Sequence, residues 1–374
     1  MRFADIPGHE EVKERLRSLA DTDRIPHALL LEGPAGTGKF ALARAFAQYV
    51  HCQNRTNGDS CGRCPACQQH QTFNHIDTIF CFPIIKNQKK KLSLCDDYLP
   101  EFRDQMQQSP FMDYDQWLLK LDNINAQPVI YVDEAAELTR KLSFTSHSSR
   151  YKIVLMWLPE KMREEAANKL LKILEEPHSD TIFVLASDNS RQILGTIYSR
   201  TQRIIVKRYP DQLVAQYLTS QFPMDEAEAL QTARLAEGSL TEALRLISLS
   251  KERTKYLDLF KELMRKAYTR NVGDLKKWAA DTAELGRERE MGFLEYCSRM
   301  LRENFILNLR QPSLLGMDQE EYQFSQKFSP FINERNVLRL FDQFNKARND
   351  IAANANAKLV NFDLSLKTIL LLKN

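Results

Sequence analysis

The first half of the chain alternates between short apolar runs and segments in which apolar residues recur at helical spacing. The apolar runs have the length of buried β-strands and lie at 28–31, 152–157, 181–186 and 204–206. Amphipathic helices are expected between them, for example at 10–20 and 164–175. Alternating strands and helices are typical of a parallel sheet covered by helices. The sequence therefore predicts an α/β fold for residues 1–207.

Beyond Tyr209-Pro210 the strand pattern disappears and the remaining chain is expected to be helical, with one loop near 311–317. Gly238-Ser239 has the residue types of a helix stop followed by a new N-cap. We expect a small helical domain at 208–250 and a larger helical domain at 251–374. The scarcity of glycine, 12 residues in 374, agrees with a helix-rich protein.

A candidate phosphate-binding loop joins the first strand to the helix expected at 39–49. Its residues are Gly33-Pro34-Ala35-Gly36-Thr37-Gly38-Lys39-Phe40. Strand, glycine loop and helix in this order fit the G-x-x-x-x-G-K part of a P-loop. In such loops backbone N–H groups and the helix N-terminus surround phosphate oxygens, and the lysine adds a full charge. The last position is normally Ser or Thr, whose hydroxyl holds Mg²⁺, so Phe40 predicts a loop that binds ATP weakly at most.

Four of the seven cysteines follow the P-loop helix with the spacing C-x8-C-x2-C-x2-C; they are Cys52, Cys61, Cys64 and Cys67. Two C-x-x-C steps allow four thiolates to surround one tetrahedral Zn²⁺, and turn-forming residues lie between them. The alternative is four unrelated thiols in a polar loop, and we favour the zinc module. Three further thiols outside this spacing are expected in the core or on the surface, namely Cys81, Cys95 and Cys297.

Charge and hydropathy narrow the possible binding partners and the cellular location of the protein. The net charge of +3 argues against a histone-like binder but permits a local basic face. One basic stretch, 86–91, could contact nucleic acid, although we favour a solvated loop. No apolar run approaches the ~20 residues of a membrane span, and the N-terminus does not resemble a signal peptide. We expect a cytoplasmic protein, in which these cysteines do not form disulfides.

An apolar run at 129–132 ends in Asp133-Glu134 and imitates a Walker B strand, whose acids hold Mg²⁺ in ATPases. If these two residues were catalytic, the chain would be a nucleotide kinase or a signalling NTPase. We favour the interpretation that the pair is a decoy, because the segment continues as a charged helix.

The order of the motifs resembles bacterial clamp-loader subunits, the AAA+ proteins of the DNA polymerase III holoenzyme. His27 to Leu31 leads into the P-loop, and the four-cysteine module follows the P-loop helix. The segment from Asn168 to Pro177 is close to the family pattern N-A-L-L-K-x-L-E-E-P, and Ser199-Arg200 matches its S-R-C motif. The resemblance is strong over residues 1–250. It extends to the rest by architecture, helped by Asn354 to Leu359.

Three departures point to one type of subunit within that family. The resemblance places the Walker B acids at Trp157 and Leu158, the sensor-2 arginine at Thr241, and the P-loop hydroxyl at Phe40. Arg200 is retained and matches the arginine finger, which stabilises charge on a γ-phosphate in a neighbouring subunit. This combination resembles the delta-prime type, which does not hydrolyse ATP itself.

The resemblance also implies an architecture and partners. It implies an AAA+ domain, a helical lid and a helical collar that packs with gamma/tau and delta subunits in a ring of five. The ring loads a sliding clamp onto primed DNA, so the chain would belong to a DNA-directed DNA polymerase (nucleotidyltransferase) holoenzyme without autonomous activity. The alternatives are a competent gamma/tau-type ATPase, because the glycines and Lys39 are retained, and a P-loop relic that acts only as a scaffold.

Overall fold

The computed structural model describes residues 1–87, 91–121, 127–176, 180–309 and 316–372. The chain forms two compact units, Met1–Leu246 and Ile247–Asn374. Parts of three predicted features lie outside the described residues: Pro177 of the N-A-L-L motif, residues 88–90 of the basic stretch and most of the loop at 311–317. No described helix is long and apolar enough to cross a membrane.

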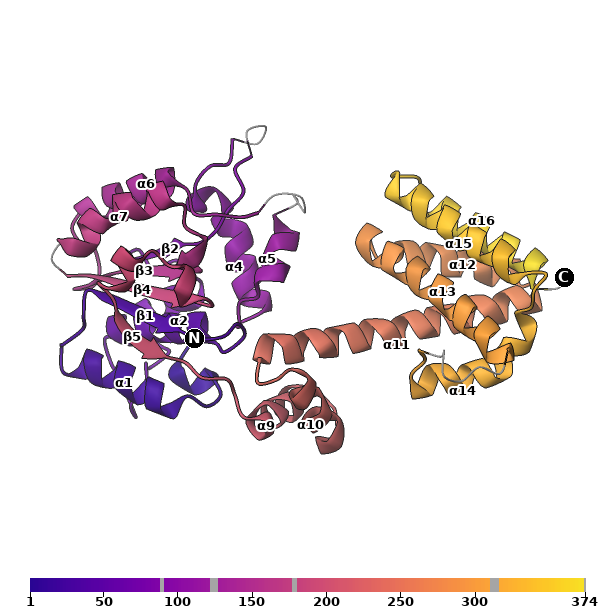
Figure 1. The fold of residues 1–374 in the computed structure, drawn as a ribbon, viewed down its shortest axis with the longest axis horizontal. Helices are drawn as coiled ribbons and strands as arrows, with labels where there is room; N and C mark the ends of the chain where they lie inside the picture. Colours follow the sequence, from indigo (N-terminus) through magenta and orange to yellow (C-terminus); the bar gives the residue numbers. More distant parts are fainter. Residues whose placement is uncertain (88–90, 122–126, 177–179, 310–315, 373–374) are drawn as a thin grey trace. The chain divides into compact units, whose positions relative to one another are not determined.

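The first unit is built on a sheet of five parallel strands in the order β2-β3-β4-β1-β5 (Figure 1). β1 lies between β4 and β5, with Leu30 opposite Leu185 on one side and Arg203 on the other. The strands are β1 (Ala28–Glu32), β2 (Thr78–Cys81), β3 (Lys152–Trp157), β4 (Thr181–Ser187) and β5 (Gln202–Ile205).

Three strands confirm the predicted apolar runs, and two differ from the prediction. β1, β3 and β4 are almost wholly buried, so each appears in the sequence as a continuous apolar run. β2 was missed, because it has only four residues and begins with a threonine. β5 begins and ends earlier than predicted: it is an edge strand in which only Ile204 is buried.

Helices cover both faces of the sheet. α6, α7 and α8 share a core with β1, β3 and β4 on one face, whereas α2 contacts β3 and β4 from the other (Figure 1). The helices of this unit are α1 (Glu10–Asp21), α2 (Lys39–His51), α3 (Pro65–Gln71), α4 (Leu99–Gln108), α5 (Tyr114–Lys120), α6 (Val132–Ser143), α7 (Glu164–Glu175), α8 (Gly195–Tyr198), α9 (Asp211–Gln221) and α10 (Glu226–Leu235). Short 3-10 helices lie at η1 (Phe3–Asp5), η2 (Cys95–Tyr98), η3 (Pro159–Lys161) and η4 (Ser190–Gln192).

All the regular secondary structure among the described residues of the second unit is helical, as predicted. It contains the C-terminal part of α11 (Leu240–Thr269), α12 (Val272–Ala283), α13 (Arg287–Asn308), α14 (Gln319–Phe328), η6 (Ser329–Phe331), α15 (Val337–Ala352) and α16 (Ala357–Leu371). α13 packs against α15 and α12 against α16, around a core that includes Phe260, Trp278 and Phe344. α11 continues unbroken past residue 250, where the sequence places the end of the small helical domain.

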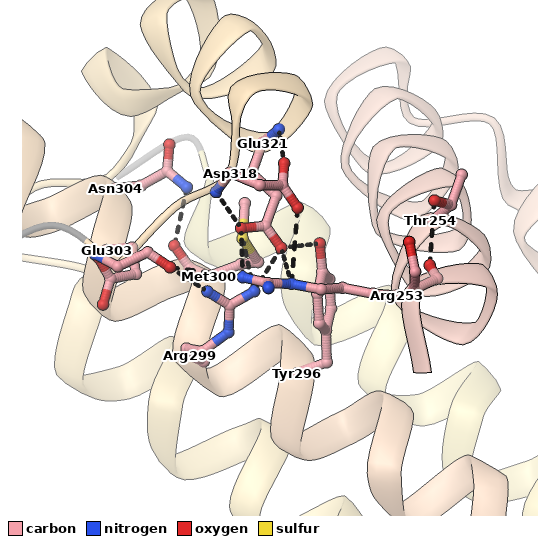
Figure 2. Close-up of polar contacts among 11 residues, drawn as sticks. Arg253, Thr254, Tyr296, Arg299, Met300, Glu303, Asn304, Asp318 and Glu321 are labelled. Carbon is pink, nitrogen blue, oxygen red and sulfur yellow. Dashed lines mark hydrogen bonds and ion pairs between the residues drawn. The ribbon is translucent and has the colours of Figure 1, made fainter. Parts of the chain in front are cut away.

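A polar network joins three helices of the second unit around Glu321, whose side chain is fully buried (Figure 2). Arg253 Nε on α11 donates to Glu321 Oε1 at 2.9 Å, as does the Tyr296 hydroxyl on α13. Arg299 Nη2 donates to the same oxygen, and the backbone N–H of Asp318 donates to Oε2 at 3.1 Å. The network holds the start of α14 against α11 and α13.

Candidate functional site

The predicted P-loop lies where the sequence placed it, between β1 and α2. Gly38 adopts a left-handed conformation (φ +75°) directly before Lys39, the first residue of α2. Gly36 is also left-handed (φ +76°), and a Cβ there would lie 1.9 Å from Ser239 Oγ. Glycine is therefore required at 36 both by the backbone and by the close approach of residues after α10.

The Lys39 amine is already paired with acceptor atoms of the protein itself. Its side chain is 3% exposed and forms an ion pair with Asp188 Oδ1 at 2.8 Å. Lys39 Nζ also donates to Thr37 Oγ1 at 3.2 Å and to the Pro34 carbonyl oxygen. An ammonium group has three donors, and all three have acceptors here.

The segment that carries Asp188 is held in place by the partly buried carboxylate of Glu160. Glu160 Oε1 accepts the backbone N–H groups of Asp188 at 2.8 Å and Asn189 at 3.1 Å. Burial raises the pKa of Glu160. Asp188 directly follows β4, so the end of this strand places its carboxylate beside the P-loop lysine. The sequence did not indicate this contact.

The P-loop is closed from the side of α11. The backbone N–H of Leu240 donates to the Gly36 carbonyl oxygen at 2.9 Å. A Cβ at Gly36 would also lie 2.6 Å from the hydroxyl of Thr241, the residue that the resemblance places at the sensor-2 position. The cavity between the P-loop, Asp188 and Thr241 has a volume of about 20 Å³. That volume holds about one water molecule and no phosphate group.

Aromatic rings line the P-loop where a Mg²⁺ site would require oxygen ligands. The ring of Phe40 lies 6.1 Å from that of Trp157 and 5.9 Å from that of Phe102, between centroids. Phe102 belongs to α4 and lies in the stretch 84–125, whose role the sequence did not reveal. Phe111, from the same stretch, also lines the small cavity. The cluster provides no oxygen ligand for a metal ion.

Asp133 and Glu134 do not form a Walker B site. The predicted strand ending in this pair is wrong: residues 129 and 130 form only isolated bridges, and both acids lie in the first turn of α6. Asp133 pairs with Lys86, and Glu134 accepts the backbone N–H of Cys95 at 2.8 Å. Asp133 and Glu134 thus both contact the segment that precedes α4. β3 ends in Trp157, where the resemblance places the first Walker B position.

Arg200 follows α8, the short helix expected near 193–198, and is partly exposed. Arg200 Nη1 donates to the Thr196 carbonyl oxygen at 2.9 Å, and Nη2 forms an ion pair with Glu175 Oε1 at 2.5 Å. The side chains of Arg200 and Glu175 are 36% and 47% exposed. Glu175 is the last residue of α7, so the two segments that resemble family motifs, 168–177 and 199–200, meet at this pair.

The four cysteines of the predicted zinc module come together. Their Sγ atoms all lie within 4.8 Å of one another, and Cys61 Sγ is 3.9 Å from Cys67 Sγ. The backbone N–H groups of Arg63 and Cys64 donate to Cys61 Sγ and lower its pKa to about 6, whereas burial raises the pKa of Cys67. Four clustered thiols with N–H donors to sulfur fit a tetrahedral Zn²⁺ site.

Three buried histidines beside this module were missed by the sequence analysis. His70 Nε2 lies 2.9 Å from His51 Nδ1, and the rings of His51 and His75 stack at 4.1 Å with an interplanar angle of 13°. Burial lowers the pKa of His51 to about 3. The His51 and His75 rings stack in parallel, so their in-plane lone pairs do not converge on one point here, and burial lowers the pKa of both rings.

Together, the strand order, the P-loop after β1 and the helical segments that follow define a protein of the AAA+ class. The family model described as "DNA polymerase III, delta subunit" matches residues 8–210. This match covers more than half of the chain, so the chain belongs to that family, whose members are bacterial clamp-loader subunits. The predicted fold class and family resemblance are confirmed to that extent.

Curated relatives agree with this assignment. The chain is 26% identical over 251 residues to DNA polymerase III subunit tau of Bacillus subtilis, covering 66% of this chain and 37% of the relative. It is 28% identical over 233 residues to subunit delta' of Escherichia coli (62% and 58%) and 30% identical over 221 residues to subunit delta' of Pseudomonas aeruginosa (59% and 55%). The matched part of this chain therefore spans between about a third and three fifths of these relatives' lengths.

Proposed function

We propose that the chain is a delta-prime-type clamp-loader subunit that neither binds nor hydrolyses ATP at its own P-loop. The occupied Lys39 amine is the observation that carries this proposal. The ion pair with Asp188 and the cavity of about 20 Å³ leave little space for a nucleoside triphosphate, and the aromatic rings at Phe40 supply no oxygen ligand for its metal ion. The sequence analysis allowed weak ATP binding, and the binding measurement described below decides between the two.

Arg200 is the residue that we propose acts on another subunit. It is partly exposed, and the Thr196 carbonyl and Glu175 fix two of its nitrogens, so the guanidinium is oriented before any partner binds. An arginine finger stabilises charge on the γ-phosphate of a neighbouring site. In this role the chain joins gamma/tau and delta subunits in a ring of five that places a sliding clamp on primed DNA. It is thus a cytoplasmic component of the polymerase holoenzyme.

The division of labour within the chain follows the predicted domains: an AAA+ part at 1–207, a helical lid at 208–250 and a collar at 251–374 that contacts the other subunits. The module of Cys52, Cys61, Cys64 and Cys67 holds one structural Zn²⁺. When bound, the ion supplies a cross-link between the chain segments before and within α3. The N–H groups of Arg63 and Cys64 then stabilise the Cys61 thiolate.

The competing function is a gamma/tau-type ATPase, which the retained Lys39 and the similarity to subunit tau of Bacillus subtilis favour. Two measurements separate the functions. The isolated chain is tested for ATP binding by calorimetry and for Mg²⁺-dependent hydrolysis, and the proposal expects neither. Hydrolysis by the isolated chain that Lys39→Met abolishes would establish the ATPase instead.

The second measurement uses the chain mixed with candidate gamma and delta subunits. We expect ATPase stimulated by clamp and primed DNA, reduced by Arg200→Ala but unchanged by Arg140→Ala. Arg140 is a suitable control because it also forms a surface ion pair, with Glu137 on α6. Wild-type stimulation by the Arg200→Ala complex would leave only the scaffold role.

A further inference from the structure

A second group of possible metal ligands lies in the first unit, outside the four-cysteine module. Cys81 ends β2, Cys95 begins η2, and Glu134 lies in the first turn of α6. All three are at most 1% exposed. Their two Sγ atoms and one carboxylate oxygen lie within 4.8 Å of one another. β2, η2 and α6 thus bring two thiols and one carboxyl group to one buried point.

The hydrogen bonds of this cluster leave one strong acceptor unused. The backbone N–H of Cys95 donates to Glu134 Oε2 at 2.8 Å. The Cys95 thiol donates to the Phe82 carbonyl oxygen at 3.2 Å, and the backbone N–H of Phe82 donates to Cys95 Sγ at 3.3 Å. Glu134 Oε1 is buried and has no hydrogen-bond partner among the described residues. Leaving a buried carboxylate oxygen without a partner is costly.

The neighbouring cations are engaged elsewhere. Lys86 pairs with Asp133 and Lys141 pairs with Asp96, both at the more exposed side of α6. Among the ion pairs of the described residues, none involves Glu134. A cation bound from outside the described chain would satisfy Glu134 Oε1.

We propose that Cys81, Cys95 and Glu134 form a second Zn²⁺ site, separate from the four-cysteine module. Two thiols and a carboxylate are the donor types that Zn²⁺ takes in proteins, and thiolates exclude Mg²⁺ and Ca²⁺. Binding would form two Zn–S bonds and one Zn–O bond, would leave the fourth position to a water molecule, and would release the two thiol protons to solvent. The N–H of Phe82 already donates to Cys95 Sγ, which is how outer-shell donors stabilise a metal-bound thiolate.

Metal content of the full-length chain tests this proposal without any partner subunit, so its outcome is independent of the clamp-loader role. Reduced protein is stripped with a chelator, reloaded with Zn²⁺ and separated from free metal, and zinc per chain is measured by mass spectrometry. We expect two zinc ions in the wild type. We expect one each in Cys81→Ser/Cys95→Ser and in Cys64→Ser/Cys67→Ser. Cys297→Ser is the matched control, because it removes a buried thiol and should leave two.

A milder variant keeps the test valid if the double serine variant does not fold. Glu134→Gln retains the shape of the side chain, and circular dichroism can verify its fold. We expect it to weaken zinc binding at this site at least tenfold in competition with a chromogenic chelator. One zinc in the reloaded wild type, two in folded Cys81→Ser/Cys95→Ser, or wild-type zinc affinity in Glu134→Gln would each overturn the proposal. A Cys81–Cys95 disulfide in freshly purified protein would overturn it also.

Discussion

The ion pair between Lys39 and Asp188 allows the closed P-loop to be tested by a measurement of stability. Asp188→Ala removes the one charged partner that Lys39 has among the described residues, and the Lys39 side chain is 3% exposed. Removing one partner of a fully buried pair costs about 3–5 kcal/mol, because a buried charge is left behind. The Asp188 side chain is 30% exposed, and Thr37 and Pro34 still accept from the amine, so we expect about 1–3 kcal/mol.

The assay is a double-mutant cycle by urea unfolding with Asp188→Ala, Lys39→Met and the double variant. If the pair stabilises the loop, Asp188→Ala should cost less in the Lys39→Met background by about 1–2 kcal/mol. Asp104→Ala is the control, because Asp104 pairs with Lys120 on the surface and should cost less than about 1 kcal/mol. If the losses of unfolding free energy in the two single variants add up to that of the double variant within about 0.5 kcal/mol, the inference that Asp188 pairs with the Lys39 amine is refuted.

Three further predictions concern the other features of the chain. In the reconstituted complex, Arg200→Lys should restore none of the ATPase activity lost in Arg200→Ala, because an ammonium lacks the planar donors of a guanidinium. Arginine fingers contribute on the order of 10³–10⁵ in rate to GTPases. Restored activity in Arg200→Lys would refute the finger role. Cys64→Ser should lower the melting temperature and zinc content more than Cys297→Ser does, and equal effects would exclude a structural zinc at the module. Burial raises the pKa of Glu321, but hydrogen bonds from Arg299 and Arg253 outweigh burial and hold this pKa below its usual range. The ionised Glu321 therefore stabilises the fold above about pH 4.3, and this contribution is lost as the pH falls through the lowered native pKa. The free energy of unfolding from urea titrations should decrease more steeply below about pH 4.3 in the wild type than in Glu321→Gln, and parallel pH profiles would contradict this.

The sequence identified those parts of the molecule that depend on local pattern. The runs at β1, β3 and β4 are buried on both faces, and the helix at Glu164–Glu175 was predicted with its observed bounds. The cysteine spacing also brought the four thiols together as expected. Each of these features is encoded within a short stretch of chain.

Other features depended on contacts that no local pattern encodes. Asp188 has no motif, and only the parallel pairing of β4 with β1 brings it beside Lys39. The ring of Phe102 fills the side of the P-loop because α4 packs there, which residues near 100 could not indicate. The predicted strand before Asp133 is wrong because residues 129 and 130 form only isolated bridges and α6 already begins at Val132.

The occupied Lys39 amine has a consequence for how the chain responds to the energy state of the cell. In a P-loop that binds nucleotide, the lysine and the residues around it change partners when ATP becomes ADP. Here the partners are Asp188, Thr37 and Pro34 of the same chain, and none of them depends on metabolite concentration. Under the proposed function, the shape of this domain stays constant over any ratio of ATP to ADP, and the chain offers its neighbours a surface that does not alter during their hydrolytic cycle.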